Sequence, residues 1–240
     1  MIAETAAELR AVALAAPDAS GHFPAMYSVV TARIAAAIEE GRFEDGPRMD
    51  RFATTFARLY LRAHADRAGA ARCWRATWDV AGDRRLLIVQ HLLLGVNAHV
   101  NYDLAHAVVE VAGPGGDLAA VRPDFEAVND VLADTYSTVL RDLHRVSRWV
   151  NLAASMGGGR VFRFSLRVAR DRAWDAAVRL HGLDEPGRRR YLAELDDLVA
   201  VLAYLVANPG PVPELAARLA RRLEEQDPLV VTRALLGAGP

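Results

Sequence analysis

The sequence predicts an all-α protein, built as a single multi-helix domain over residues 1–240. Apolar residues recur every three or four positions through most of the chain, which is the spacing of one helix face. No segment shows the strict alternation of apolar and polar residues that indicates a half-buried strand. Glycine and proline gather between the apolar stretches, where they favour turns. No repeat of fixed period and no long linker divides the chain, so we expect one core.

Turn residues set the order and the bounds of the expected helices. Residues 17–21 separate the first two helices, and residues 41–47 separate the next two. Residues 113–117 form the densest glycine and proline cluster and end a long central helix. The triple glycine at 157–159 and the sequence Asn-Pro-Gly-Pro at 208–211 mark later breaks. The expected helices span about 3–16, 23–41, 47–69, 72–79, 84–112, 122–154, 161–182, 187–208 and 212–225.

Two features concern how these helices pack. We expect the central helix, about 84–112, to be buried against the long helix at about 122–154, because the central helix is apolar all round. Residues 187–225 could instead form a C-terminal helical hairpin that contacts a second copy of the chain in a homodimer. The arginines of that segment fit a solvated face equally well.

The composition excludes several kinds of chemistry. All 29 basic residues are arginines, because the sequence contains no lysine, so neither a lysine Schiff base nor a P-loop lysine is available. Cys73 is the single cysteine, which excludes an internal disulfide and a cysteine-rich zinc module. A formal net charge of −1 argues against nucleic acid as a partner.

The sequence favours a cytoplasmic location. Residues 1–5 lack the basic start of a signal peptide. The longest apolar run, residues 86–100, is too short to span a membrane and is interrupted by glutamine, asparagine and two histidines. A single free cysteine suits a reducing compartment.

The central helix carries polar residues within an apolar body. On a wheel of about 100° per residue, one third of the circumference holds His91, His99, Tyr102, Asp103 and His106. Gly95 lies on the same face and would leave room for a partner or a ligand. Asn97 and Asn101 form a second polar stripe on a different face. Each of these groups needs a hydrogen-bond partner if it is buried.

His99 and Asp103 are one helical turn apart, so their side chains are neighbours. Imidazole and carboxylate groups on one face could hold a divalent metal, Zn or Fe, with His91, His106 or Asp124 completing the ligand set. Alternatively, Asp103 would orient His99 as a general base through the ring N–H. A buried histidine beside an aspartate is also common as a satisfied core pair, and Asp124 also fits a helix cap.

Other side chains are candidates for contacts with a small-molecule substrate. They are Asn97, Asn101, Tyr102, Asn129, Trp74, Trp78, Arg163 and Arg167. The two tryptophans lie one turn apart and could wall an apolar pocket, and the arginines belong to a stripe at residues 160–170 that could bind an anion. The structural alternatives are buried amides that tie helices together, tryptophans that fill the core, and a solvated arginine face.

The block Asn-Ala-His-Val-Asn-Tyr-Asp-Leu at 97–104 resembles a bacterial family of unknown function whose central helix reads N-A-H-[IV]-N-x-D-L. Further likeness lies in residues 23–27, 50–60 and 124–129, so the resemblance covers about residues 20–180. It implies an all-helical domain without an assigned reaction. The site residues that it implies are Asn97, His99, Asn101, Asp103, Asp124 and Asn129. The block is also loosely similar to helical zinc phospholipases and nucleases with a His-x-x-x-Asp core, by analogy alone.

The sequence leaves three functions open. The first is a metal-dependent, hydrolase-like enzyme in which His99 and Asp103 are ligands and bound Zn or Fe activates water. The second is a cofactor-free enzyme, such as a cyclase, dehydratase or isomerase, that acts on an apolar small molecule with His99 as its acid or base. The third is a helical binding or scaffold protein without catalysis. The second predicts an apolar cavity that reaches His99.

Overall fold

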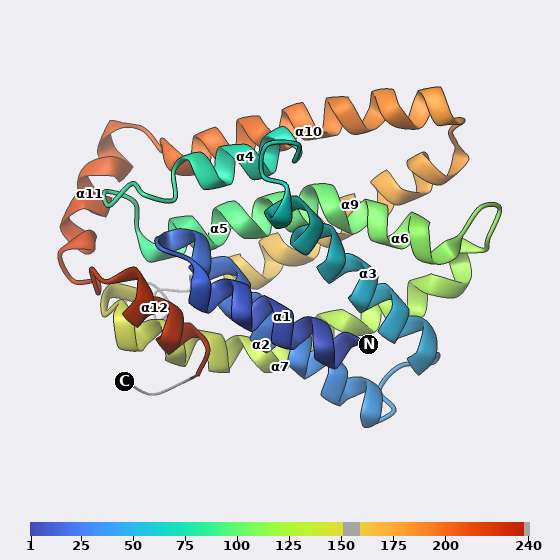
Figure 1. Cartoon of the computed structure of the whole chain (residues 1–240), viewed down its shortest axis with the longest axis horizontal. Coiled ribbons are helices and arrows are strands. Elements are labelled where there is room, and N and C mark those ends of the chain that lie inside the picture. The colour runs from blue at the N-terminus through green and yellow to red at the C-terminus, as the bar shows by residue number, and fades with distance from the viewer. Residues whose placement is uncertain (151–158, 238–240) are drawn as a thin grey trace.

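The computed structural model describes residues 1–150 and 159–237, without the side chains of residues 159–164 and 212–213 (Figure 1). Its elements are α1 (Ile2–Ala15), η1 (Ala19–Gly21), α2 (His22–Glu39), α3 (Gly46–Ala65), α4 (Arg72–Asp79), α5 (Ile88–Ala98), η2 (His99–Asp103), α6 (Leu104–Ala112), α7 (Leu118–Val146), α9 (Gly159–Gly182), α10 (Glu185–Ala207), α11 (Pro211–Arg221) and α12 (Pro228–Leu235). Apart from an isolated bridge between Ser147 and Glu224, the described residues form no β-structure. The predicted all-α class is therefore confirmed. Within the same residues, no helix is both long and apolar enough to cross a membrane.

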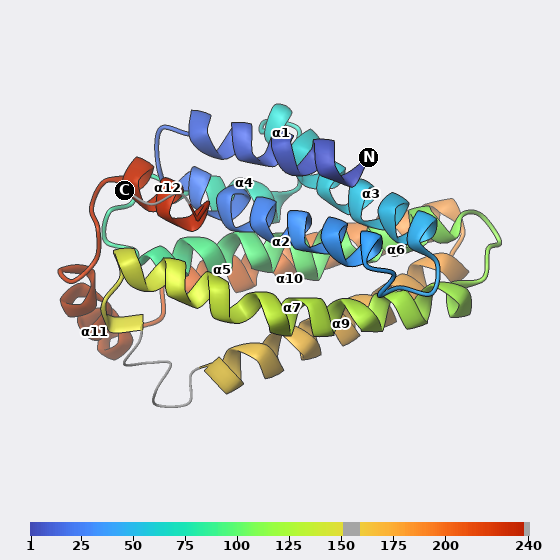
Figure 2. The same cartoon turned by 90° about the horizontal axis from the view of Figure 1, so that it is seen from below.

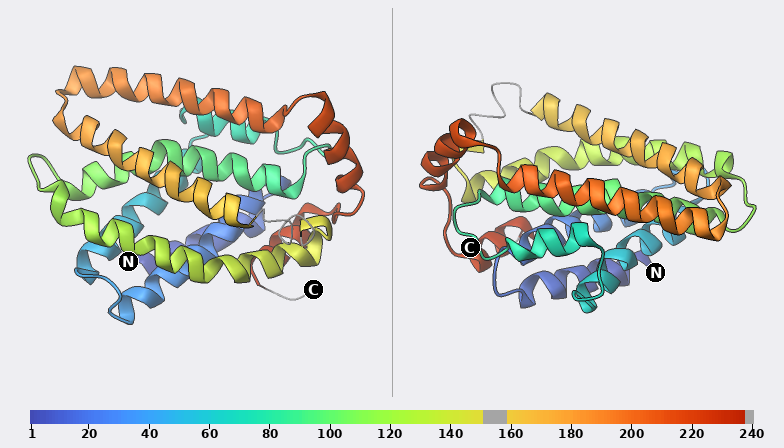
Figure 3. Two further views of the ribbon diagram at one scale, coloured as in Figure 1. Left: turned by 180° about the vertical axis from the view of Figure 1, so that it is seen from behind. Right: turned by 90° about the horizontal axis from the view of Figure 1, so that it is seen from above.

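The central helix predicted at 84–112 is present as three consecutive elements, α5, η2 and α6, which run through the middle of the molecule (Figure 3). α4 and α10 pack against α5, and α3 and α9 pack against α6. Leu94, Ala98, Leu104 and Val108 are fully buried along this axis. A helix that is apolar on every side can be covered on every side, which explains its central place.

Two side chains fix the start of α5 at Ile88, one turn later than the sequence predicts. The Leu87 N–H donates to Gln90 Oε1 at 2.9 Å, and the Ile88 N–H donates to Glu224 Oε2 at 3.0 Å. The first amides of a helix have no partner within the helix, so side-chain acceptors at these positions decide where it begins. Because Glu224 comes from the far end of the chain, this start is set by tertiary structure.

Between α5 and α6 the backbone makes a π-helical turn, η2. A π turn accommodates an extra residue, so side chains after it rotate relative to those before it. The members of the polar face that a regular wheel predicts have different neighbours in the structure. Tyr102 and His106 contact each other, whereas the His91 ring lies against the His22 ring of α2. Such turns recur at functional sites, which draws attention to His99 at its first position.

α7 is the long helix predicted at 122–154, and it begins earlier. The Asp117 side chain accepts a hydrogen bond from the Ala119 N–H at 2.8 Å and caps the helix, so that Pro123 lies inside it rather than in its first turn. The helix ends at Val146, and the predicted residues 151–154 lie outside the described residues. α7 runs beside α2 (Figure 2) and contacts α6. Residues of both α5 and α7 line a cavity.

The segment predicted as a C-terminal hairpin, residues 187–225, divides between two environments. α10 packs along α4 and α5 and buries Val199. The Asp196 carboxylate accepts hydrogen bonds from the backbone N–H groups of Arg72 and Cys73 at the start of α4. α11 turns away from α10 at one end of the molecule and leaves Leu219 exposed (Figure 1). α10 thus packs against helices of the core.

Gly95 allows α2 to pack closely on α5. A Cβ atom at this position would lie 2.3 Å from Cγ of Phe23, so Phe23 fills the space that the sequence assigned to a ligand or a partner. We expect Gly95→Ala to lower the free energy of unfolding by about 1–3 kcal/mol, because Phe23 must leave its buried position. Urea denaturation measures the effect. Gly182→Ala is the matched control, because it also adds a methyl group to a helix but meets nothing within 4 Å. Equal stabilities for the two variants would contradict this account.

Candidate functional site

A cavity of about 660 Å³ lies among α2, α3, α5, η2, α7 and α9. This volume is within the range of small-molecule sites, about 300–1,000 Å³. Its wall is mainly aliphatic and aromatic, with polar contributions from Thr31, His99, Asn129, Asp130, Thr135, Tyr136, Arg167 and Arg170. The two threonine hydroxyls donate to carbonyls of their own helices. Asp130, Ala133 and Arg167 are exposed, which places the mouth beside α7 and α9.

His99 is the histidine in this wall, and its ring is held by Asp103. The two side chains are buried, at 2% and 3% exposure, and His99 Nδ1 lies 2.9 Å from Asp103 Oδ2. The same oxygen accepts a hydrogen bond of 3.0 Å from Trp74 Nε1. Because a carboxylate oxygen is an acceptor, Nδ1 carries the proton and Nε2 presents a lone pair. Among the described residues, Nε2 is buried without a hydrogen-bond partner.

Aromatic side chains fix the plane of the His99 ring. Phe56 of α3 stacks on it with centroids 3.6 Å apart and an interplanar angle of 8°. Tyr27 of α2 meets it edge-on at 4.5 Å and 67°, and Phe23 does so at 5.6 Å. With Asp103 bound at one nitrogen and Phe56 on one face, the imidazole has little freedom to rotate.

Burial lowers the pKa of His99 below its ordinary value of 6.5, and the hydrogen bond from Nδ1 to Asp103 opposes this effect without reversing it. The imidazole is therefore neutral at neutral pH. Burial and the nearby Asp103 charge raise the pKa of Tyr27 well above 10, so its phenol remains protonated. The arrangement places one neutral base, with a free lone pair, in an apolar wall.

Arg170 of α9 lies at the α7 side of the cavity and is 4% exposed. Its Nε donates to Asn129 Oδ1 at 2.8 Å, its Nη2 donates to the Phe125 carbonyl, and its guanidinium lies 4.3 Å from the Phe125 ring centroid. Burial lowers the pKa of Arg170 to about 10, so the group keeps its charge at neutral pH. Arg167 is also in the wall, whereas the side chain of Arg163 lies outside the described residues.

Most of the other predicted substrate contacts tie helices together. Asn97 Nδ2 donates to the Val199 carbonyl of α10 at 2.9 Å, and Asn101 Nδ2 donates to Asn97 Oδ1 at 2.9 Å. Trp74 reaches Asp103, and Trp78 stacks on Trp74 with centroids 5.4 Å apart. None of these side chains, nor Tyr102, lines the cavity. Of the predicted substrate-binding residues, Asn129 and Arg167 do.

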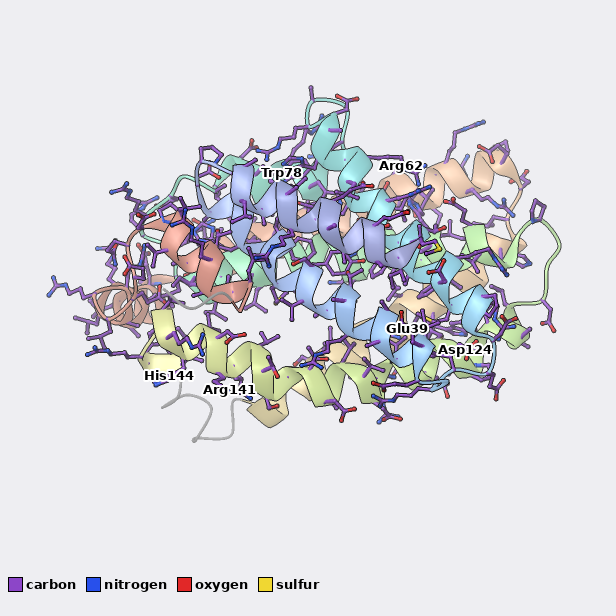
Figure 4. The ribbon with its side chains drawn as sticks, turned by 60° about the horizontal axis from the view of Figure 1, so that its bottom comes forward. Glu39, Arg62, Trp78, Asp124, Arg141 and His144 are labelled. Carbon is purple, nitrogen blue, oxygen red and sulfur yellow. The ribbon has the colours of Figure 1, made fainter. Side chains whose placement is uncertain are left out.

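The five predicted metal ligands do not come together. His91 contacts His22, His106 contacts Tyr102, and Asp124 lies near the loop between α2 and α3. Figure 4 shows Asp124 at the opposite side of the molecule from Trp78, whose neighbour Trp74 holds Asp103. Within the part of the chain that the structure describes, no group of three or more His, Cys, Asp or Glu side chains could hold a metal ion.

Asp124 instead binds the end of the α2–α3 loop and the start of α3. Its carboxylate accepts hydrogen bonds from the Glu44 and Asp45 N–H groups at 2.7 and 3.3 Å, and it pairs with Arg48 Nη2 at 2.7 Å. The Asp124 side chain is 3% exposed and that of Arg48 is 18% exposed. The carboxylate is thus saturated by donors from this chain, which leaves it a structural part of the α3 start.

Asp124→Ala is expected to lower the free energy of unfolding by about 3 kcal/mol, because it leaves Arg48 and two loop amides without their acceptor. Asp134→Ala on the same helix is the control. Asp134 pairs with Arg42 at 2.9 Å, but its side chain is 67% exposed, so we expect a loss below about 1 kcal/mol. Urea denaturation of both variants measures the difference. If they lost equal amounts, the buried network around Asp124 would not stabilise the fold as described.

Several cavity residues were not named individually as site residues, notably Tyr27, Phe56 and Arg170, of which Arg170 was predicted only as part of the arginine stripe at residues 160–170. The first two contact the His99 ring from α2 and α3, and the third supplies the buried charge. The segments 23–27 and 50–60, which carry part of the family resemblance, contain Tyr27 and Phe56. Those segments were therefore an available signal, but only the fold shows that they meet at His99.

The comparisons with known proteins agree with the sequence resemblance. The model of a family of unknown function, DUF5995, matches residues 2–209. This span includes every helix that borders the cavity, together with His99, Asp103 and Arg170. No curated protein and no solved structure matches the chain. The chain therefore belongs to DUF5995, a family of unknown function.

Proposed function

We propose that this protein binds an apolar small molecule in the cavity and catalyses a proton transfer on it, with His99 as the general base. One observation carries the proposal. His99 lines the cavity with its Nδ1 engaged by Asp103, while Nε2 is buried and has no partner among the described residues. A buried polar atom without a hydrogen-bond partner costs free energy. A bound molecule that donates a hydrogen bond to Nε2 would supply the partner.

The contacts around His99 suit this role. Asp103 keeps the ring proton on Nδ1, so Nε2 remains the unprotonated nitrogen with a lone pair. When Nε2 accepts a proton from the bound molecule, the Asp103 carboxylate stabilises the resulting imidazolium. Trp74 holds that carboxylate, and Phe56 holds the ring plane. Isomerisation, dehydration and cyclisation are reactions that such a base can serve, because each requires removal of one proton.

Metal-dependent hydrolysis is not part of this proposal. A metal site would require several ligand atoms around one point. Among the described residues, His99 and Asp103 are hydrogen-bonded to each other and no third side chain joins them as a ligand. The apolar wall provides what the base mechanism needs, because exclusion of water strengthens the interaction between imidazole and carboxylate.

The test is a proton-transfer reaction that needs no natural substrate. In 5-nitrobenzisoxazole a base removes the C3 proton, the N–O bond breaks, and a coloured cyanophenolate forms. We expect saturable catalysis by the wild-type protein and a loss of about 100-fold or more in His99→Gln. N-phenyl-1-naphthylamine, a neutral apolar fluorophore, should bind both proteins equally, which shows that the cavity is intact. Equal rates for the two proteins would refute the proposal.

The pH dependence of the same reaction follows from the lowered pKa of His99. Only the neutral imidazole accepts a proton, and burial moves its pKa below 6.5. The rate should therefore be constant from pH 8 down to about 6.5 and should fall in more acidic solution as His99 becomes protonated. Initial rates measured between pH 5 and 8 test this. A decline that begins above pH 7 would assign the base to another group.

A binding protein without catalysis is the second candidate, because the same apolar wall would hold a ligand without any reaction. The two candidates differ in one result. Binding of N-phenyl-1-naphthylamine without conversion of 5-nitrobenzisoxazole would favour the binding protein.

A further inference from the structure

We infer that the molecule bound in the cavity carries a carboxylate, which Arg170 recognises, on a hydrocarbon body that the remaining wall encloses. The inference rests on the proposed function, since it assumes that the cavity is a binding site. It names the class of ligand, an amphipathic carboxylic acid, and a residue that selects it.

Arg170 is a buried charge without a counter-charge in contact. Its two described hydrogen bonds go to neutral oxygens, the Asn129 side chain and the Phe125 carbonyl. Among the described residues, no carboxylate lies within ion-pair distance of its guanidinium. The hydrogen bonds to described residues come from Nε and Nη2 and leave Nη1 without an acceptor among them. Asp171 favours the charged form only from a longer distance. A cation that is 4% exposed and lacks an anionic partner is energetically unfavourable.

The comparison with Arg48 shows what a structural arginine looks like in this protein. Arg48 is less buried, yet it pairs with the buried Asp124 at 2.7 Å and with Asp45 at 3.5 Å. A link between α7 and α9 would need only neutral donors, whereas Arg170 brings a full charge to the wall of an apolar cavity. A ligand carboxylate would bind the guanidinium fork and remove this cost.

The remaining wall defines the rest of the ligand. Val30, Ile34, Leu92, Val96 and Val139 are among the aliphatic residues that line it from α2, α5 and α7. Among the described residues, the other charged groups in the wall are Asp130 and Arg167, which have opposite signs and are exposed at the mouth. Within this described wall, Arg170 is therefore the buried charge that distinguishes an acid from an alcohol of the same shape.

The experiment compares dodecanoic acid, dodecan-1-ol and dodecylamine at pH 8, each displacing N-phenyl-1-naphthylamine from the full-length protein. We expect the acid to bind about tenfold or more tightly than the alcohol, and the amine to bind most weakly. Arg170→Gln should abolish the preference for the acid and leave alcohol binding unchanged. Arg172→Gln, an exposed arginine on the same helix that does not line the cavity, is the matched control and should keep the preference.

The outcomes separate this inference from the proposed function. If the alcohol displaces the fluorophore and the acid binds no more tightly, the carboxylate inference is refuted and the cavity remains a binding site. If neither compound nor the fluorophore binds, both proposals fail. A preference for the acid that persists in Arg170→Gln would also refute the inference. Should that variant not fold, the ranking of acid, alcohol and amine by the wild-type protein decides alone.

Discussion

Replacing Asp103 by asparagine is expected to slow the proposed proton transfer by about 100-fold while the protein stays folded. The carboxylate accepts hydrogen bonds from both His99 Nδ1 and Trp74 Nε1. The amide oxygen of asparagine can occupy the place of Asp103 Oδ2 and accept both hydrogen bonds, but asparagine carries no negative charge. The imidazolium that forms when His99 accepts a proton then has no carboxylate beside it, so the base is weakened although its position is kept. The rate with 5-nitrobenzisoxazole measures this effect.

Two further variants show whether the effect belongs to the charge of Asp103. Asp130→Asn removes a carboxylate from the wall without touching His99 and should leave the rate unchanged. Asp103→Ala should lower the free energy of unfolding by about 2–4 kcal/mol, because the Trp74 N–H loses its acceptor in a buried place. A normal rate in Asp103→Asn, together with a lost rate in His99→Gln, would show that the base does not depend on the negative charge of Asp103.

Lowering the pH from 7.5 to 4.5 is expected to remove about 5 kcal/mol of stability through two buried histidines alone. His22 and His91 lie edge to face with centroids 5.9 Å apart. Burial lowers the pKa of His22 from 6.5 to about 3 and that of His91 to about 4. The charges of His91 and Arg221 also lower the pKa of His22, whereas the charge of Asp18 raises it. Asp83 opposes the shift of His91.

The sign follows from the direction of these pKa values. Both groups bind protons more weakly in the folded than in the unfolded protein, so stability is fully present above pH 6.5 and is lost as the pH falls towards the folded values. The contribution of each histidine at pH 4.5 is about 2–3 kcal/mol. Because small domains have a total stability of about 5–15 kcal/mol, the protein should be close to unfolding at that pH.

The test is urea denaturation of the wild-type protein and of His22→Phe at pH 7.5 and 4.5. At pH 7.5 the His22 imidazole is neutral in both the folded and the unfolded protein, so the variant should be close to the wild type in stability. This measurement is the control for the comparison at pH 4.5. At pH 4.5 the variant should be about 2 kcal/mol more stable relative to the wild type than at pH 7.5. The same difference at both pH values would mean that His22 does not resist protonation in the folded protein.

The candidate site illustrates what local spacing can and cannot predict. The interval of four residues between His99 and Asp103 anticipated their contact, because such residues are neighbours on any helical turn. The wheel did not predict the neighbours of the other histidines on that face, because His91 meets His22 of α2 and His106 meets Tyr102. The local sequence did not indicate that Phe23 would occupy the space beside Gly95, because that contact joins α2 to α5.

By itself the sequence determined the helical class, the places where most helices break and the buried position of the central segment. These properties depend on periodicity, turn residues and apolar content, all of which are local. Only the tertiary structure decided which polar residues meet. It joined Trp74 to Asp103, Asp124 to Arg48, and Tyr27 and Phe56 to His99. These contacts depend on how helices far apart in the chain pack, and the same packing leaves the cavity between α5 and α7 with His99 in its wall.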